Sequence, residues 1–183
     1  MNKVKNYALF ICDMQVKTIN NLFYKDNVIN NINKLSYMKK YIPSIKLGIL
    51  GEFIPEKLGL TDSSIDRNNI DMYGSKIKYS MVDNYLIHQL NKHNISDIIL
   101  TGMETQWCIN NTTKDLIDLN YKVHIPQDAI GNSLNNNENI YNIKHLENIN
   151  NNVNITTTDA FICNFLDKDD DLASQKYLQL IKK

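Results

Sequence analysis

The amino-acid sequence predicts an α/β fold of three layers, with a roughly six-stranded parallel sheet covered by helices on both faces. Short apolar runs alternate along the chain with segments whose apolar residues recur at helical spacing. The runs are apolar throughout, which is typical of parallel strands buried on both faces. No internal repeat or linker divides the 183 residues, so we expect a single domain over residues 1–183.

In the first half of the chain we expect three strands and one helix. The strands are the apolar or β-branched runs Tyr7–Asp13, Ser44–Leu50 and Ile70–Tyr73. Between the first two strands, Asn27–Met38 repeats apolar residues every three or four positions, which predicts a helix. Pro55 and Gly59 mark residues 52–59 as a loop.

The second half continues the alternation of strands and helices. Its asparagine cluster, Asn135–Asn137, is expected to be loop. The expected strands are Ile98–Thr101, Tyr121–Ile125 and Val153–Thr158, and the expected helices are Asp83–Asn91, a helix from about Trp107, Asn139–Ile149, Ala160–Leu166 and Leu172–Ile181.

Charge and cysteine content narrow the function classes. Lysine plus arginine equals aspartate plus glutamate at 20 each, so electrostatics give no reason to expect nucleic acid or a membrane as partner. Three widely spaced cysteines make a poor disulfide framework, which favours a reducing, cytoplasmic location. We see neither a signal peptide nor an apolar stretch long enough to cross a bilayer.

Cys108 is the candidate nucleophile suggested by local pattern. It lies where a helix is expected to begin after a buried strand, and free N–H groups at a helix N-terminus favour a thiolate and can hold an oxyanion. An ordinary buried cysteine is the alternative. Cys12 and Cys163 lie inside apolar runs, where a core position is the better interpretation.

Asp13 is the second candidate, because it ends the first strand. Ligands of such sheets bind outside the carboxyl ends of the strands, where Asp13 and Cys108 could share one crevice. Asp13 could instead cap the following helix.

Metal and cofactor sites find little support in the sequence. The four histidines show no paired ligand spacing, and the glycines are too scattered to form a phosphate-binding loop. We therefore expect no metal and no cofactor, and a flavodoxin-like cofactor binder is the least favoured function. A Cys–His pair stays open, with His124 the histidine nearest a strand end.

Four segments, in this order and spread along the chain, resemble the isochorismatase-like cysteine hydrolases, and most closely their isochorismatase domain-containing branch. They are Leu9–Gln15, Gly51–Gly59, Lys76–Met81 and Gly102–Cys108, with weaker support from residues 127–129, 155–159 and 172–182. The resemblance implies that family's Rossmann-like α-β-α fold.

The resemblance also implies a catalytic triad of Asp13, Lys76 and Cys108. Lys76 is chosen over Lys78 because the family's lysine precedes an aromatic–serine pair by three residues. A cis peptide is implied between Met103 and Glu104, with the backbone N–H groups of Glu104 and Cys108 forming the oxyanion hole.

The implied activity is hydrolysis of a small amide or related C–N compound through a thioester on the cysteine. Gln106, Trp107, Tyr79 and Glu52 are expected at the substrate pocket, and Gln106 replaces a histidine usual in this branch. The segment after Glu52 lacks the histidines of the metal-binding nicotinamidases, which argues against a metal. A homo-oligomer is implied by resemblance only. The alternative is a catalytically weak or silent member of the fold that acts as a binding or assembly partner.

Overall fold

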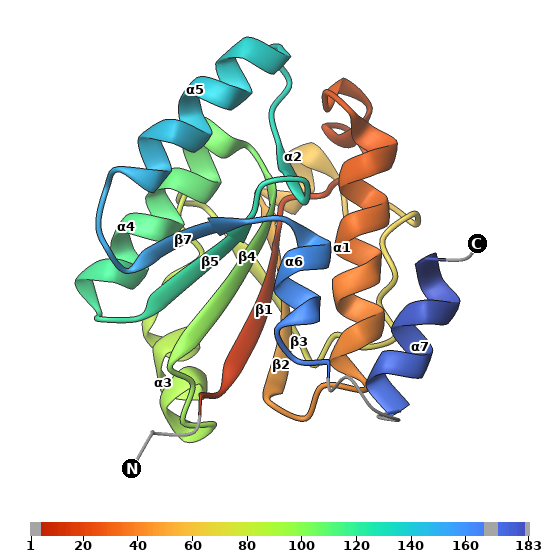
Figure 1. The fold of residues 1–183 in the computed structure, drawn as a ribbon. Coiled ribbons are helices and arrows are strands. Elements are labelled where there is room, and N and C mark those ends of the chain that lie inside the picture. The colour runs from red at the N-terminus through yellow and green to blue at the C-terminus, as the bar shows by residue number, and fades with distance from the viewer. Residues whose placement is uncertain (1–4, 167–171, 182–183) are drawn as a thin grey trace.

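The computed structural model describes residues 5–166 and 172–181, and its centre is a parallel sheet of seven strands (Figure 1). The sheet confirms the predicted α/β class. The two-residue strand β6, which pairs with β4, was not expected because so short a run has no periodicity. In spatial order the main strands are β3 (Met72–Lys76), β2 (Ile45–Phe53), β1 (Tyr7–Cys12), β4 (Asp97–Met103), β5 (Lys122–Pro126) and β7 (Val153–Thr156), and β6 is Ile130–Gly131.

Helices cover both faces of the sheet, which makes the three layers (Figure 1). One face carries α1 (Lys25–Lys39), α6 (Thr158–Cys163) and α7 (Leu172–Ile181). The other carries α3 (Asn84–Lys92), α4 (Asn110–Asp118) and α5 (Asn136–Glu147). Three short turns complete the described elements: η1 (Ile19–Asn21), α2 (Pro55–Leu58) and the π-helical turn η2 (Thr105–Ile109).

The central strand β1 explains why its sequence is apolar without alternation. Leu9 and Ile11 point to the core beneath α1, whereas Ala8, Phe10 and Cys12 point to the core on the opposite face. Successive side chains of a strand project to opposite faces, so a strand with a core on each side needs apolar residues at every position.

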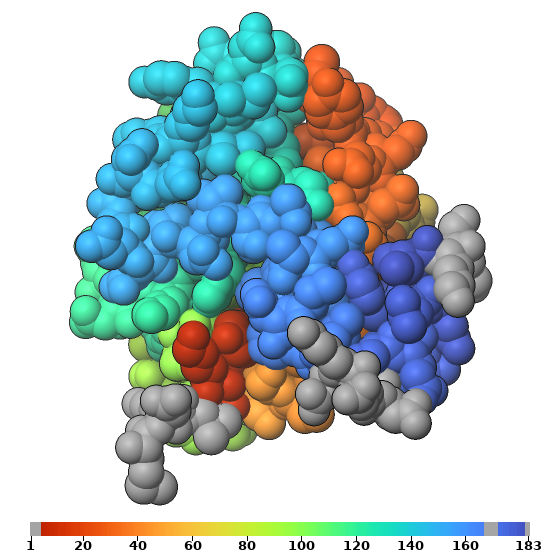
Figure 2. Space-filling model, viewed as in Figure 1, coloured from red at the N-terminus to blue at the C-terminus, as the bar shows by residue number. Residues whose placement is uncertain are grey.

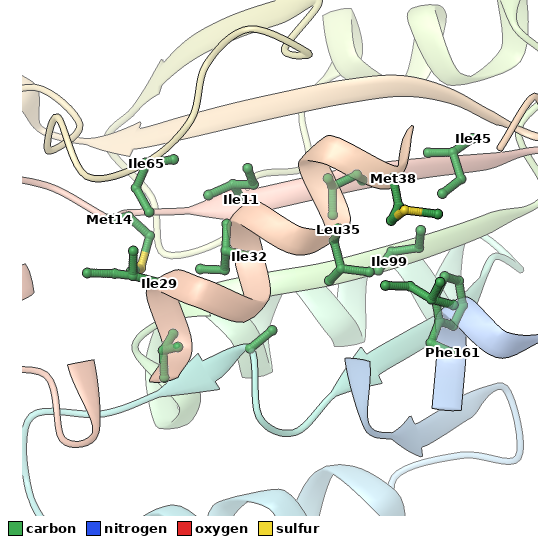
Figure 3. Close-up of a cluster of buried hydrophobic side chains, with 14 of the residues drawn as sticks. Ile11, Met14, Ile29, Ile32, Leu35, Met38, Ile45, Ile65, Ile99 and Phe161 are labelled. Carbon is green, nitrogen blue, oxygen red and sulfur yellow. The ribbon is translucent and has the colours of Figure 1, made fainter. Parts of the chain in front are cut away.

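Figure 3 shows how α1 closes one of these cores. Ile32 and Leu35 project from the helix toward Ile11 and Ile99 of the neighbouring strands β1 and β4. All four side chains are at most 1% exposed. Burial of each such side chain contributes about 1.5–3 kcal/mol, so the predicted helical stripe anchors α1 firmly on the sheet.

The same face continues into the C-terminal helices. Figure 2 shows α6 and α7, in blue, lying beside α1, in orange. Lys34 of α1 forms an ion pair with Asp159 of α6, with Nζ 2.6 Å from Oδ1. Within the described residues we find no helix that combines the length and the apolar character needed to span a bilayer.

The edge strands differ from the sequence prediction in a way that matters for the site. β2 continues to Phe53, and residues 55–58 form a helical turn rather than a loop. β3 lies two to three residues later than predicted and ends at Lys76, because it pairs with the extended part of β2, with Phe53 opposite Lys76. Lys76 therefore stands at the carboxyl end of a strand.

Four helix starts were also predicted too late. Those of α1 and α6 lie two residues earlier than expected, at Lys25 and Thr158, and the other two change how their segments are interpreted. The segment before α4 turns helically from Thr105, so Cys108 lies about one turn inside it. α5 begins at Asn136, and Asn135 caps it by accepting a hydrogen bond of 2.9 Å from the N–H of Glu138. The asparagine cluster is thus a helix start, since asparagine is a favoured N-cap residue.

Candidate active site

Asp13, Lys76 and Cys108 meet at the carboxyl end of the sheet. Asp13 follows β1, Lys76 ends β3, and Cys108 lies in η2 after β4. Nζ of Lys76 lies 2.8 Å from Oδ2 of Asp13 and 3.2 Å from Sγ of Cys108. Two side chains that are distant from Lys76 in the sequence are therefore within hydrogen-bond reach of its ammonium group.

The ends of β1 and β4 approach closely enough to bring Asp13 beside the cysteine turn. Gly102 has φ +107°, and a Cβ there would collide with the carbonyl oxygen of Cys12. Only glycine fits such a position. Asp13 itself adopts a left-handed φ of 55°, which aspartate tolerates better than most residues, and its N–H donates to the carbonyl of Gly51 over 2.9 Å.

The ammonium of Lys76 is fixed from several sides. Besides its two site partners, it donates to the carbonyl oxygen of Tyr79 over 3.0 Å and lies 4.8 Å from the ring centre of Phe53. Its side chain is 9% exposed and that of Asp13 is 8% exposed. This burial makes the position of the ion pair well defined and its electrostatic effect on Cys108 strong.

The surroundings keep the thiol of Cys108 protonated. Burial, followed by the negative charge of Asp13, raises its pKa to about 12, although Lys76 opposes this. Burial also raises the pKa of Asp13 despite the neighbouring ammonium. Burial alone would lower the pKa of Lys76, but the negative groups around it raise that pKa instead. The thiolate expected at a helix N-terminus is therefore not the favoured resting form.

The carboxylate of Asp13 has one oxygen available. Oδ2 accepts from Lys76, whereas Oδ1 is buried and accepts no hydrogen bond of ordinary geometry. The Cys108 thiol acts on this carboxylate as a hydrogen-bonding neighbour. A buried oxygen without a strong donor is able to take up a proton from a nearby acid.

The turn that carries Cys108 begins with a cis peptide bond between Met103 and Glu104. This is the bond at which the family resemblance implies a cis peptide. The Glu104 carboxylate then accepts hydrogen bonds from Nε2 of Gln106 over 3.1 Å and from the N–H of Ser133 over 3.0 Å. These bonds connect the cysteine turn to the segment that follows β6.

A pocket of about 190 Å³ opens beside the cysteine. One of its walls includes aromatic rings in a stack: Phe53 and Tyr79 lie 5.5 Å apart and Tyr79 and Trp107 lie 5.4 Å apart between ring centres. Residues from several elements line it, namely Asp13, Thr18, Phe53, Leu58, Tyr79, Met103, Glu104, Trp107 and Cys108.

Of the four residues expected at the pocket, Tyr79 and Trp107 line it and two do not. Oε1 of Glu52 accepts from the N–H and the hydroxyl of Thr61, over 2.7 and 2.8 Å, so its carboxylate is occupied there. Gln106 instead donates to Glu104.

Sequence reasoning missed four pocket residues. Phe53 and Leu58 belong to the segment expected to be loop, and Met103 ends a strand expected to be shorter. Thr18 carries no sequence signal at all, because it reaches the pocket only through the turn after β1.

The other candidate ligands and nucleophiles lie elsewhere. Nε2 of His124 is 2.8 Å from Oδ1 of Asp97, the first residue of β4, so this histidine is at the opposite end of that strand from Cys108. Cys12 is buried, but Cys163 is exposed, contrary to its predicted core position, because α6 buries the preceding Phe161 and Ile162 instead. Among the described residues, no three His, Cys, Asp or Glu side chains are grouped to hold a metal ion.

Comparison with known proteins adds sequence and structural relatives. Residues 52–160 match the Isochorismatase domain. The chain is 33% identical over 162 residues to Isochorismatase family protein 1B of Dictyostelium discoideum, covering 85% of this chain and 76% of that protein.

Two solved structures share the fold. One is the MAR1 ribonuclease of Caenorhabditis elegans, with a TM-score of 0.87, 27% identity and coverage of 99% of this chain and 92% of that one. The other is an isochorismatase-like hydrolase from Alkaliphilus metalliredigens, with a TM-score of 0.72, 18% identity and coverage of 88% and 99%.

Proposed function

The chain belongs to the isochorismatase family, and on that premise we propose that it is a cysteine hydrolase of small amides or related C–N compounds. The observation that carries the proposal is the position of one buried ammonium, Lys76 Nζ, 2.8 Å from a carboxylate oxygen of Asp13 and 3.2 Å from the Cys108 sulfur. A general base, a cation and a nucleophile within hydrogen-bond reach are what covalent catalysis requires.

The first half of the reaction forms a thioester. Cys108 Sγ attacks the substrate carbon while its proton passes to Asp13, whose Oδ1 is free of strong donors. The former carbonyl oxygen becomes an oxyanion, for which we assign the backbone N–H groups of Glu104 and Cys108. Collapse of the intermediate breaks the C–N bond, and Asp13 returns the proton to the leaving amine.

The second half regenerates the enzyme. A water molecule gives a proton to Asp13 and attacks the thioester carbon, and the C–S bond breaks as Asp13 returns that proton to the sulfur. Lys76 stays protonated throughout and stabilises the negative charge as it moves between Asp13 and Cys108. The raised pKa of Asp13 makes its carboxylate a stronger base, and the raised pKa of Lys76 keeps its ammonium charged. The raised pKa of Cys108 opposes ionisation of the thiol at rest, so the thiol loses its proton only during attack.

The name of the Caenorhabditis elegans relative raises a second activity. That protein is named a ribonuclease. The formal net charge of this chain is zero, however, and nucleic-acid binding relies on positive charge against the phosphates. We therefore favour a small-molecule substrate and include RNA only as a comparison.

The proposal is tested by a screen of small amides, with single-stranded RNA as comparison, on the wild-type chain and three variants. We expect Cys108→Ala to lower turnover by at least about a thousandfold, and Cys108→Ser to lower it strongly. The matched control is Cys163→Ala, which changes an exposed cysteine outside the site and should retain full activity.

Two results would contradict the proposal. Equal turnover by Cys108→Ala and wild type would show that Cys108 is not the nucleophile. An absence of turnover for every amide would instead favour a catalytically silent binding or assembly role.

A further inference from the structure

We propose that the pocket at Cys108 selects uncharged substrates that carry a flat apolar group the size of a single aromatic ring, and that it rejects anions. This inference rests on the proposed function, because it names the substrate class of the same site. It follows from two properties of the pocket lining: its charge, and its size and apolar chemistry.

The charge of the pocket disfavours an anionic substrate. Two carboxylates, Asp13 and Glu104, line it, and its lining includes no lysine or arginine. The cation of the site, the Lys76 ammonium, already donates hydrogen bonds to Asp13, Cys108 and the Tyr79 carbonyl. Among the described residues, no basic side chain pairs with Glu104; its hydrogen bonds come from neutral donors. A substrate carboxylate would thus lose its hydration against apolar walls, close to the negative charge of Glu104, without gaining a cation in return.

The size and chemistry of the lining suit one flat ring. Leu58 and Met103 are apolar, and Phe53, Tyr79 and Trp107 present aromatic carbon. An apolar protein cavity of about 150 Å³ is known to hold benzene. The pocket of about 190 Å³ therefore has room for a ring of that size and the adjoining amide group. Aromatic rings also gain from contact with one another beyond the burial of area.

Three alkylating agents of matched chemistry test the inference on the whole chain. Iodoacetamide is neutral, iodoacetate is anionic, and iodoacetanilide is neutral with a phenyl ring. Exposed Cys163 is an internal reference for their intrinsic reactivity, and labelling of each cysteine is read by peptide mass spectrometry. The quantity compared is the labelling rate of Cys108 divided by that of Cys163. We expect this ratio to be about tenfold higher with iodoacetamide than with iodoacetate. We expect it to be severalfold higher with iodoacetanilide than with iodoacetamide.

Two pairs of variants separate the charge and ring contributions. Leu58→Arg adds a cation to the pocket, and Leu60→Arg adds the same charge at a neighbouring exposed position that does not line it. Only the first should raise labelling of Cys108 by iodoacetate. Trp107→Ala should remove the preference for iodoacetanilide, whereas Tyr141→Ala, at an exposed residue of α5, should not.

If Leu58→Arg does not fold, Glu104→Gln provides the charge test by removing one carboxylate. The inference is overturned if the ratio of Cys108 labelling to Cys163 labelling is the same with iodoacetate as with iodoacetamide. It is also overturned if that ratio is no higher with iodoacetanilide than with iodoacetamide.

Turnover distinguishes this inference from the proposed function. Benzamide should be hydrolysed faster than its 3-carboxylate derivative by roughly tenfold or more. Equal hydrolysis of the two overturns the charge selectivity and leaves the cysteine hydrolase intact. Both labelling preferences without hydrolysis of any amide support the pocket's selectivity and overturn the proposed function.

Discussion

The two ends of the sheet carry similar buried polar groups in very different states. Toward the amino ends of β4 and β5, Asp97 bonds His124 over 2.8 Å through one oxygen and Ser96 over 2.6 Å through the other. At the carboxyl end, Asp13 uses one oxygen for Lys76 and leaves the other without a hydrogen bond of ordinary geometry. Measured over the whole residue, both aspartates are at most 6% exposed.

The pKa values show what this difference means. Burial opposes ionisation of Asp97, but hydrogen bonds from His124 and Ser96 hold its pKa below the ordinary value. Burial raises the pKa of Asp13, and Lys76 only partly offsets this. A fully bonded carboxylate is a structural anion, whereas an incompletely bonded one beside a thiol and a pocket can exchange a proton. Burial alone does not distinguish the two.

The sharpest test exchanges the acid for an amide at each end. We expect Asp13→Asn to lower kcat/KM by about 10²–10⁴-fold, because it removes the proposed general base. Asp97→Asn should change kcat/KM little, since it lies at the other end of β4. Steady-state kinetics on the best amide measure both. Comparable losses in the two variants would show that the activity reflects general stability of the sheet.

The second test concerns which lysine matters. Lys76→Met should lower kcat/KM by about a hundredfold, because charge moving between Asp13 and Cys108 would lack its buried cation. Lys78→Met changes an exposed residue two positions away and should be neutral. If Lys78→Met were the damaging variant in the same assay, the choice of Lys76 would be wrong.

The third test is the pH dependence. Asp13 must be ionised to accept the proton, and its raised pKa means that kcat/KM should fall with decreasing pH at a value above the ordinary 3.9 or so. Alkylation of Cys108 should still be rising at pH 10, since the thiol pKa is about 12.

The variant Asp13→Asn provides the contrast. It removes a charge that raises the pKa of Cys108, so at pH 8 it should be alkylated about tenfold faster than wild type while being less active. A plateau of wild-type labelling near neutral pH would contradict the protonated resting thiol.

The smallest expected effect is at the amino end. Ser96→Ala should lower the free energy of unfolding by about 1 kcal/mol at neutral pH, through loss of a hydrogen bond to an ionised carboxylate. Because the pKa of Asp97 is lowered in the folded state, this stabilisation is present above its unfolded pKa and is lost as pH falls through the folded value. Denaturant unfolding of the wild type and of Ser96→Ala at several pH values checks this. A difference that grows on acidification would have the wrong sign.

Much of the fold could be predicted because it is encoded locally. Buried parallel strands such as Tyr7–Cys12 are apolar at every position, and α1 repeats its apolar residues at helical spacing. The predicted ends of the strands and helices were less accurate. β3 reaches Lys76 only because β2 extends beside it, which is a tertiary pairing that no local pattern records.

The sequence by itself determined the parallel sheet and, through the family resemblance, the choice of Asp13, Lys76 and Cys108. Only the tertiary structure decided their state. It buries the thiol beside a carboxylate, so that its pKa is raised where the helix position suggested a thiolate. It also holds the side chains of Glu52 and Gln106 in hydrogen bonds, so that neither lines the pocket. The physical reason is that apolar periodicity is a property of neighbours in the chain, whereas burial and charge at a site sum over segments that only folding brings together.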